Sequence, residues 1–421
     1  MGKAISIILL GIMISTITLR LRAQRAVVDS VDNVKKKYNL QMVRNIANSG
    51  ANVALNALTV NVEEEQGASY VPLFGGRYSY YFQRQDQDPN LTSTQVRVTA
   101  IGYYSGLIDT VMVLLTRPSF SRFAYFTNHE GNIWFWTGDT IRGPAHTNTY
   151  FQMGERPVFF GKVTSHQVYN SSQPYREYPY SYTNPAFFGG TEWKVPFLTM
   201  PTEIPEDLIN ASKDGGIYIN KRYAWIIFKS NGTVKIAAKN TKSNPPSSAY
   251  TTYDLSNTNG VIYVHYKSKR PVVKVKGTVN GRVTVATRGS IKVTGDLVCA
   301  DNPRTNPNSD DIIGLAAARD IIVVNNQHDQ DRTIQATVMT MNPATAPNKN
   351  FWVYRYDADR YGYLHLYGGL IQNSRGAVGL VGSAYSRKGY LKDYRWDPRL
   401  RVMIPPHFPM LFVLRKIAWW D

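Results

Sequence analysis

The most informative pattern of apolar and polar residues lies at the start of the chain. Residues 4–19 (AISIILLGIMISTITL) carry no charge and are largely apolar, and Arg20, Arg22 and Arg25 follow them. Beyond these arginines the apolar residues recur at steps of three and four, which is the period of one helix face. These residues are Val27, Val31, Val34, Tyr38, Met42 and Ile46. No proline precedes Pro72. The pattern therefore predicts one helix over residues 3–58, roughly 80 Å long at 1.5 Å per residue.

The uncharged segment has three interpretations, and the sequence leaves all of them open. As a helix, residues 4–19 span roughly 24 Å, less than the hydrocarbon core of about 30 Å, which fits a cleaved signal peptide. The segment also fits a permanent single-span anchor, although arginines on its C-terminal side favour a body that stays inside. The third interpretation is a segment that leaves the bilayer and enters a filament core.

The rest of the chain predicts mainly β-structure. Residues 59–125 alternate polar and apolar positions with many aromatics, as strands do. Residues 165–195 are rich in Tyr, Pro, Asn and Ser and predict a long surface loop. A second helix is expected only over residues 204–216, where proline and acids precede a Gly-Gly stop. The apolar and aromatic C-terminal end (PMLFVLRKIAWWD) is expected to dock on the body or on a partner.

Residues 260–324 have a repeated texture of short alternating strands separated by turn residues. The strands are GVIYVHY, VVKVKGTV, GRVTVAT, GSIKVTGDLV and AARDIIVV. Such strands fit hairpins of a sandwich or rungs of a parallel solenoid. The expected fold class is α+β, mainly β: a long N-terminal hydrophobic helix followed by a large β-rich body, an irregular β-solenoid or β-sandwich. The expected domains are the helix (1–58), a β-rich domain with the GPAHTN segment (59–250), and solenoid-like repeats with a C-terminal β region (251–421).

The net charge of +18 is concentrated in one part of the chain. Residues 215–295 hold fourteen basic residues and one acid, Asp254. On alternating strands such as VVKVKGTV, Lys274 and Lys276 share one face of a sheet. We interpret this region as a sheet face for anionic polymers, either DNA or acidic glycan, and the alternative is a solvated or subunit-facing surface. The candidate polyanion-binding residues are Lys267, Lys269, Arg270, Lys274, Lys276, Arg282, Arg288 and Lys292.

No catalytic motif is recognisable in the sequence. The seven histidines lack the paired spacing of metal ligands, and there is no P-loop, GxSxG or CxxC motif. Cys299 lies in an apolar run and is expected to be a buried hydrophobe. His146, in GPAHTN, is expected to supply structural hydrogen bonds together with its neighbours Thr147 and Asn148. The sequence therefore predicts no enzymatic activity, no cofactor and no metal site.

The N-terminal segment resembles the helix of type IV pilins, and in particular of PilX-like minor pilins. RNIANSGANVALNAL (44–58) is similar to the end of those helices. Several runs of the body resemble an uncharacterised domain found behind such helices in PilX-like proteins. They are FAYFTN (123–128), TGDTIRGPAHTN (137–148), RPVFFGKVTS (156–165), NGRVTVATRGSIKVTGDLVCAD (280–301), DDIIGLAAARDIIV (310–323) and GGLIQNSRGAVG (368–379). The chain departs from classical prepilins at Ile7, which stands where they carry a glutamate five residues after the cleaved glycine.

The resemblance implies a structural subunit, pilin or minor pilin, of a type IV pilus-like extracellular filament. Its partners would be copies of itself in a helical homo-polymer or other pilins, and it would be anchored in the inner membrane before assembly at the cell surface. The residues expected to drive assembly are Ile5, Ile8, Leu9, Ile12, Leu19, Val27, Val31, Val34, Tyr38, Met42 and Ile46. The alternative is a membrane-anchored envelope adhesin that binds DNA or anionic polysaccharide through the basic β face. A third hypothesis is a β-solenoid enzyme.

Overall fold

A computed structural model describes residues 2–92, 94–171, 173–179, 182–325, 328–342, 350–380 and 388–421. The chain forms two compact units. Unit 1 comprises residues 1–118 and 413–421, and unit 2 comprises residues 119–412. The domain boundary expected at residue 250 lies inside unit 2. The predicted class is confirmed, because one long N-terminal helix precedes a large β-rich body.

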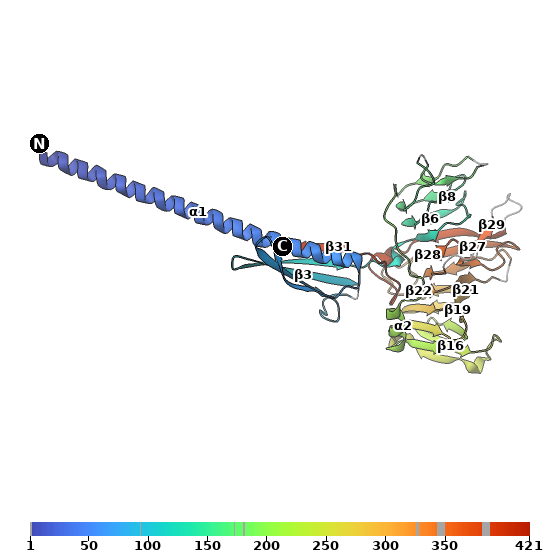
Figure 1. Ribbon diagram of the computed structural model, residues 1–421. Helices are drawn as coiled ribbons and strands as arrows, with labels where there is room; N and C mark the ends of the chain where they lie inside the picture. Colours follow the sequence, from blue (N-terminus) through green and yellow to red (C-terminus); the bar gives the residue numbers. More distant parts are fainter. Residues whose placement is uncertain are drawn as a thin grey trace. The chain divides into compact units, whose positions relative to one another are not determined.

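Unit 1 consists of the helix α1 and an antiparallel sheet with the strand order β1-β2-β3-β4-β31 (Figure 1). The helix extends over Gly2–Val60 without interruption, close to the predicted residues 3–58. The last strand is formed by the C-terminal end of the chain, which was expected to dock on the body or on a partner and which pairs with β4. The strands are β1 (Ala68–Leu73), β2 (Gly76–Gln83), β3 (Gln95–Tyr104), β4 (Leu107–Thr116) and β31 (Arg415–Trp420).

The C-terminal part of α1 is held against this sheet by small and aliphatic side chains. Gly102 of β3 permits the close approach, since a Cβ atom there would lie 2.5 Å from the carbonyl oxygen of Val43 and 2.7 Å from the amide nitrogen of Ala47. The helix residues Val43, Ile46, Ala47, Ala51, Ala54 and Leu58 are each at most 1% exposed. Their spacing of three and four residues places them on one helix face. This part of α1 is therefore an integral element of unit 1.

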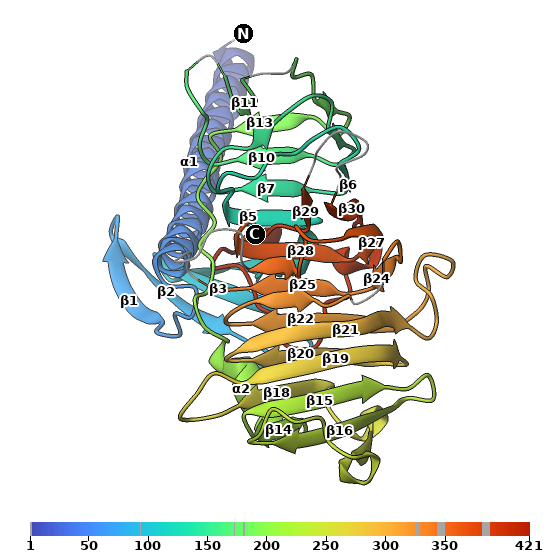
Figure 2. The same cartoon turned by 90° about the vertical axis from the view of Figure 1, so that its right-hand side faces the viewer.

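Unit 2 is built from two largely parallel sheets, which Figure 2 shows as a ladder of strands. The first parallel sheet has the order β13-β10-β7-β5-β28-β25-β22-β20-β18-β14. Its strands are β5 (Tyr125–His129), β7 (Ala145–Thr147), β10 (Val163–Ser165), β13 (Thr191–Trp193), β14 (Ile217–Asn220), β18 (Val261–His265), β20 (Arg282–Thr287), β22 (Ile312–Ala317), β25 (Thr337–Thr340) and β28 (Gly369–Ser374).

The second parallel sheet has the order β12-β9-β6-β30-β27-β24-β21-β19-β15, to which β16 and β17 add in antiparallel fashion. Its main strands are β6 (Thr140–Arg142), β9 (Val158–Phe159), β12 (Ala186–Phe187), β15 (Tyr223–Phe228), β16 (Thr233–Lys239), β17 (Thr251–Asp254), β19 (Val272–Val279), β21 (Ser290–Cys299), β24 (Arg332–Ile334), β27 (Arg360–Tyr367) and β30 (Lys388–Arg395). In addition, β23 (Ile321–Val323) and β26 (Phe351–Val353) extend it from β21, β29 (Gly379–Leu380) pairs with β30, and β8 (Gln152–Met153) pairs with β11 (Arg176–Glu177).

Between β18 and β23 the chain alternates between the two sheets, so strands that are consecutive in this part of the sequence do not pair with each other. From β18 to β21 each strand pairs in parallel with the strand two positions later. We call the resulting arrangement of unit 2 the parallel stack. Alternate residues such as Val273, Val275, Ile291 and Val293 are fully buried between the sheets, whereas Lys274 and Lys292 lie on the outer side. The repeated texture of residues 260–324 therefore corresponds to parallel pairing and not to hairpins.

Two segments of the chain meet in the middle of the parallel stack. The strands of residues 125–193 form one end, the strands of residues 217–395 form the other, and β5 pairs with β28 where they meet. A connection that includes the short helix α2 (Glu206–Lys213), which lies within the predicted residues 204–216, joins the two ends. The first and last residues of unit 2 lie close together, because Ser119 forms an antiparallel bridge with Met410.

Candidate functional site

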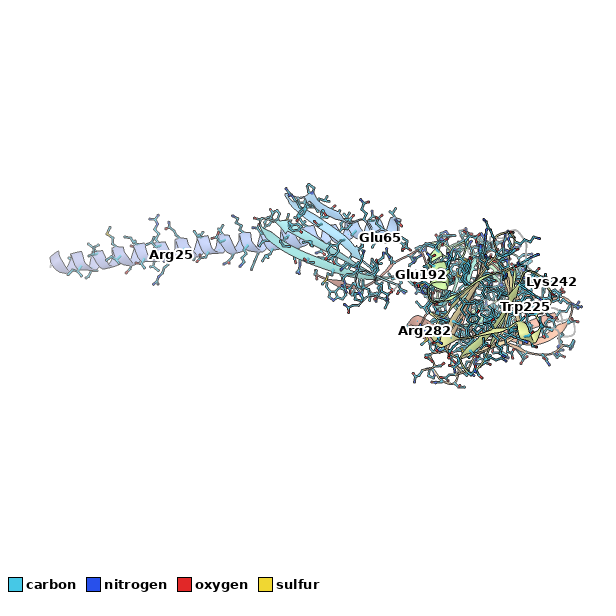
Figure 3. The ribbon with its side chains drawn as sticks, turned by 90° about the horizontal axis from the view of Figure 1, so that it is seen from below. Arg25, Glu65, Glu192, Trp225, Lys242 and Arg282 are labelled. Carbon is cyan, nitrogen blue, oxygen red and sulfur yellow. The ribbon has the colours of Figure 1, made fainter. Side chains whose placement is uncertain are left out.

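The apolar N-terminal part of α1 is exposed at Ile5 and from residue 7 to residue 38. Side chains that the sequence predicts to drive assembly are between 56% and 64% exposed from Ile5 to Tyr38. They are Ile5, Ile8, Leu9, Ile12, Leu19, Val27, Val31, Val34 and Tyr38. By length and composition alone, this helix contains a segment long and apolar enough to cross a membrane. Figure 3 shows Arg25 projecting from this part of the helix, beyond the strands of unit 1.

The last two residues of the predicted assembly set differ from the others. Met42 is partly buried, and Ile46 is fully buried, with its Cδ1 atom close to Gly76 of β2. Ile46 therefore packs inside unit 1 and is not available to a neighbouring copy. The sequence contained a signal for this change, since Val43, Ala47, Ala51, Ala54 and Leu58 form a second stripe of small and aliphatic residues at helical spacing.

Four of the eight predicted polyanion-binding residues meet at one corner of the parallel stack. Lys267, Lys269 and Arg270 follow β18, and Arg288 follows β20, the neighbouring strand of the first parallel sheet. With Arg319, which follows β22, they line a cavity of about 240 Å³ that we call the corner hollow. Glu203, Tyr266, Ser268 and Ala318 complete its lining. The corner hollow thus contains five cationic side chains and one carboxylate.

Two more of the predicted residues, Lys274 and Lys292, lie in register on β19 and β21. They line a second cavity of about 450 Å³, the face hollow, together with Thr294, Val324, Asn325, Arg332 and Tyr354. Burial lowers the pKa of Lys274, and the charges of Lys292 and Lys242 lower it further. The Lys274 ammonium lies 5.3 Å from the ring centroid of Trp225, and Figure 3 labels Trp225 and Lys242 in this region.

The remaining two residues belong to neither hollow. Lys276 is exposed on the outer side of β19, and Arg282 donates a hydrogen bond from Nη2 to the carbonyl oxygen of Ile404 at 3.2 Å. The predicted single basic sheet face is thus divided by the structure into the corner hollow, the face hollow and two isolated positions. Arg319 and Arg332, which contribute to the hollows, were absent from the predicted set because they lie beyond the lysine-rich stretch of sequence.

His146 of β7 is buried in a hydrogen-bonded network. Its Nε2 atom donates to Oδ1 of Asn148 at 3.0 Å, because an amide oxygen can only accept, and its Nδ1 atom lies 2.8 Å from the hydroxyl oxygen of Thr164. The imidazole stacks on Phe126 with ring centroids 5.3 Å apart. Burial, opposed by the bond to Asn148, lowers the pKa of His146 from 6.5 to about 4.

This pKa predicts a pH-dependent stability. Between pH 6.5 and 4 the unfolded chain binds a proton at His146 that the folded chain does not, so folding is favoured at the higher pH. Above pH 6.5 this group does not reduce the free energy of unfolding. As the pH falls from 6.5 to 4, the free energy of unfolding declines by about 3 kcal/mol. Chemical denaturation at a series of pH values should show a shallower decline for His146→Gln than for the wild type. Equal slopes in the two proteins would contradict this assignment.

Cys299, the one cysteine of the chain, is buried. Burial raises the pKa of the Cys299 thiol to about 12, and its sulfur lies 3.7 Å from the carbonyl oxygen of Asp311. Within the described ranges, no group of three or more His, Cys, Asp or Glu side chains is arranged to hold a metal ion.

Comparisons with known proteins give a family model and a similar solved structure. Residues 77–167, from β2 to just beyond β10, match the family model of a domain of unknown function, DUF4900. No protein with a curated description matches the chain. Among solved structures, the chain is similar to the crystal structure of the competence-associated pilin ComZ from Thermus thermophilus. That similarity has 12% sequence identity, covers 85% of this chain and 86% of ComZ, and has a TM-score of 0.33.

Proposed function

We propose that this chain is a structural subunit, pilin or minor pilin, of a type IV pilus-like extracellular filament. It polymerises through the exposed part of α1 and is anchored in the inner membrane before assembly. The observation that carries this proposal is the two-part pattern of exposed apolar residues on α1. Residues 5–19 are apolar around the whole helix, which suits lipid or the centre of a helix bundle, and residues 27–38 carry one apolar stripe, which suits a partner helix.

Heterologous contacts between copies explain how such a helix forms a filament. The part of α1 from residue 5 to residue 42 is roughly 57 Å long at 1.5 Å per residue. If one copy uses different patches of this length to meet the copies before and after it, the contacts do not close into a ring and the assembly is an open helical polymer. The sheet of unit 1 and the parallel stack of unit 2 need not take part in these contacts.

Truncation at two positions tests the proposal. A chain of residues 40–421 keeps the buried stripe from Val43 to Leu58, so we expect a folded, soluble protein that forms no filaments. A chain of residues 59–421 is the matched control: it also lacks the stripe, so unit 1 should lose its protection from proteolysis. Electron microscopy of filaments sheared from cells that produce the full chain, with determination of the mature N-terminus, completes the test. Filaments formed by residues 40–421 would refute a role of the exposed helix in assembly.

The second candidate function is a membrane-anchored envelope adhesin that binds an anionic polymer, DNA or glycan. The corner hollow favours it, because cations gathered with a single acid create a positive surface. The two functions are compatible, since α1 and the corner hollow belong to different units. They differ in the expected state of the full chain, which is a filament for the subunit and dispersed anchored copies for the adhesin.

A further inference from the structure

The corner hollow is formed by three successive turns of the parallel stack. The turns follow β18, β20 and β22, which are paired in this order in the first parallel sheet. Paired strands lie about 4.8 Å apart, so the cations on these turns are brought close together. Lys267, Arg270 and Arg288 are exposed. The concentration of positive charge is therefore produced by the fold and accessible from solvent.

The cations of the corner hollow are largely uncompensated. None of the ion pairs formed within the described part of the chain involves Lys267, Lys269, Arg270 or Arg288. The Nη1 atom of Arg319 donates a hydrogen bond to Oδ1 of Asn342 at 2.7 Å. This amide is neutral, so the charge of Arg319 is not compensated by it. Burial lowers the pKa of the neighbouring His265, and the charges of Arg288 and Lys213 lower it further. A cavity of this kind is suited to an anionic ligand.

The other groups of the corner hollow identify which anion fits. The Glu203 carboxylate repels any anionic group placed directly beside it, but it accepts hydrogen bonds from hydroxyl groups, which a sugar ring has and a phosphodiester lacks. Ser268 and the hydroxyl group of Tyr266 also bind hydroxyls. Single-stranded nucleic acid is usually held by several stacking aromatic rings, whereas Tyr266 is the sole aromatic side chain among the lining residues described. A cavity of about 240 Å³ accepts a projecting group better than a duplex.

We propose that the corner hollow binds an acidic saccharide. Arg270 and Arg288 hold the carboxylate or sulfate substituent, because a guanidinium group donates two parallel hydrogen bonds to such an anion. Glu203 and Ser268 bind the hydroxyl groups of the ring. This inference specifies the ligand of the adhesin function and rests on it, but it does not depend on filament formation.

Calorimetry with the full chain in detergent micelles tests the inference. The probes are a hexamer of galacturonic acid, a sulfated heparin hexasaccharide, a neutral cellulose hexamer and single-stranded DNA of matched charge. We expect one or both acidic saccharides to bind more tightly than DNA, with the stronger of the two identifying the substituent, and the neutral hexamer not to bind. Arg270→Gln with Arg288→Gln should weaken binding roughly tenfold or more, because the charge-assisted hydrogen bonds of two guanidinium groups are lost.

Two variants distinguish this site from general electrostatic attraction. Lys276→Gln with Arg282→Gln removes the same charge outside both hollows and should leave saccharide binding within about twofold of the wild type. Glu203→Gln should weaken saccharide binding but not DNA binding. If DNA binds as tightly as the saccharides, or if both double variants lose affinity equally, the saccharide site is refuted while a polyanion-binding adhesin survives. If no acidic probe binds at low salt, the saccharide site and the polyanion-binding adhesin are both refuted.

Discussion

Filaments should disappear when Val31 and Val34 are both replaced by aspartate, while the two compact units remain folded. Both valines are exposed on the apolar stripe of α1, 59% and 64% respectively, so the substitutions remove no contact within unit 1. In the proposed filament each valine would contribute roughly 1.5–3 kcal/mol by burial, and an unpaired carboxylate at the same place would cost more. Filament yield in sheared cell fractions, together with proteolytic protection of the soluble protein, measures the effect.

The matched control places the same two charges elsewhere on the helix. Ala26 and Asn33 are also exposed, and at 100° per residue both lie on the side opposite Val31. Ala26→Asp with Asn33→Asp should therefore reduce filament yield much less. A normal yield from the Val31→Asp, Val34→Asp chain would exclude the stripe from the assembly interface, and equal losses from the two pairs would point to charge and not to the stripe.

Replacing Arg375 with alanine should destabilise unit 2 by about 3–5 kcal/mol, because it leaves a buried carboxylate without its cation. Arg375 follows β28, and its Nη1 atom lies 3.1 Å from Oε2 of Glu130, which follows β5. The two side chains are 4% and 2% exposed. The same Nη1 atom donates to the carbonyl oxygen of Ile133 at 3.0 Å, and the guanidinium group lies 3.7 Å from the ring centroid of Phe135. This pair therefore fastens the two ends of the parallel stack where they meet.

An exposed ion pair provides the comparison. Lys162 and Glu192 also pair across neighbouring strands, but their side chains are 57% and 55% exposed, so Lys162→Ala should cost less than about 1 kcal/mol. Combining Arg375→Met with Glu130→Leu should cost less than the sum of the single substitutions, since no charge remains buried without a partner. Denaturant titrations measure all of these changes. An Arg375→Ala loss as small as that of Lys162→Ala would show that the pair does not fasten the stack.

The sequence predicted the elements of this fold better than their pairing. The unbroken period of α1 and the Gly-Gly stop after α2 were sufficient to identify both helices. The strands β18 to β21 lie where the alternating pattern predicted them, whereas the expected strand AARDIIVV is broken by the turn at Arg319, between β22 and β23. Alternation specifies which side chains face the interior but not which strand is the neighbour, so hairpin and parallel pairing were indistinguishable.

Two further features could not be predicted from the sequence, and each failure has a physical reason. Residues 165–195, expected to be a loop, contain β11, β12 and β13, which are two or three residues long and too short to show a period. The charged residues were assigned to one sheet face because strand alternation predicts faces. Lys267, Lys269 and Arg270 lie in a turn, and their position depends on the stacking of turns that are adjacent only in the folded chain.

The pairing of β5 with β28 also has a consequence for synthesis, because two strands that lie far apart in the sequence leave the ribosome at different times. Glu130 and Arg375 are 245 positions apart. A ribosome that adds about 5–20 residues per second needs roughly 12–50 s to deliver the second after the first. During this interval the edge of β5 that β28 will cover has no partner, and an open strand edge readily pairs with another chain. Each nascent copy therefore passes through a period in which it must be kept apart from others, even though the finished protein is proposed to assemble with them.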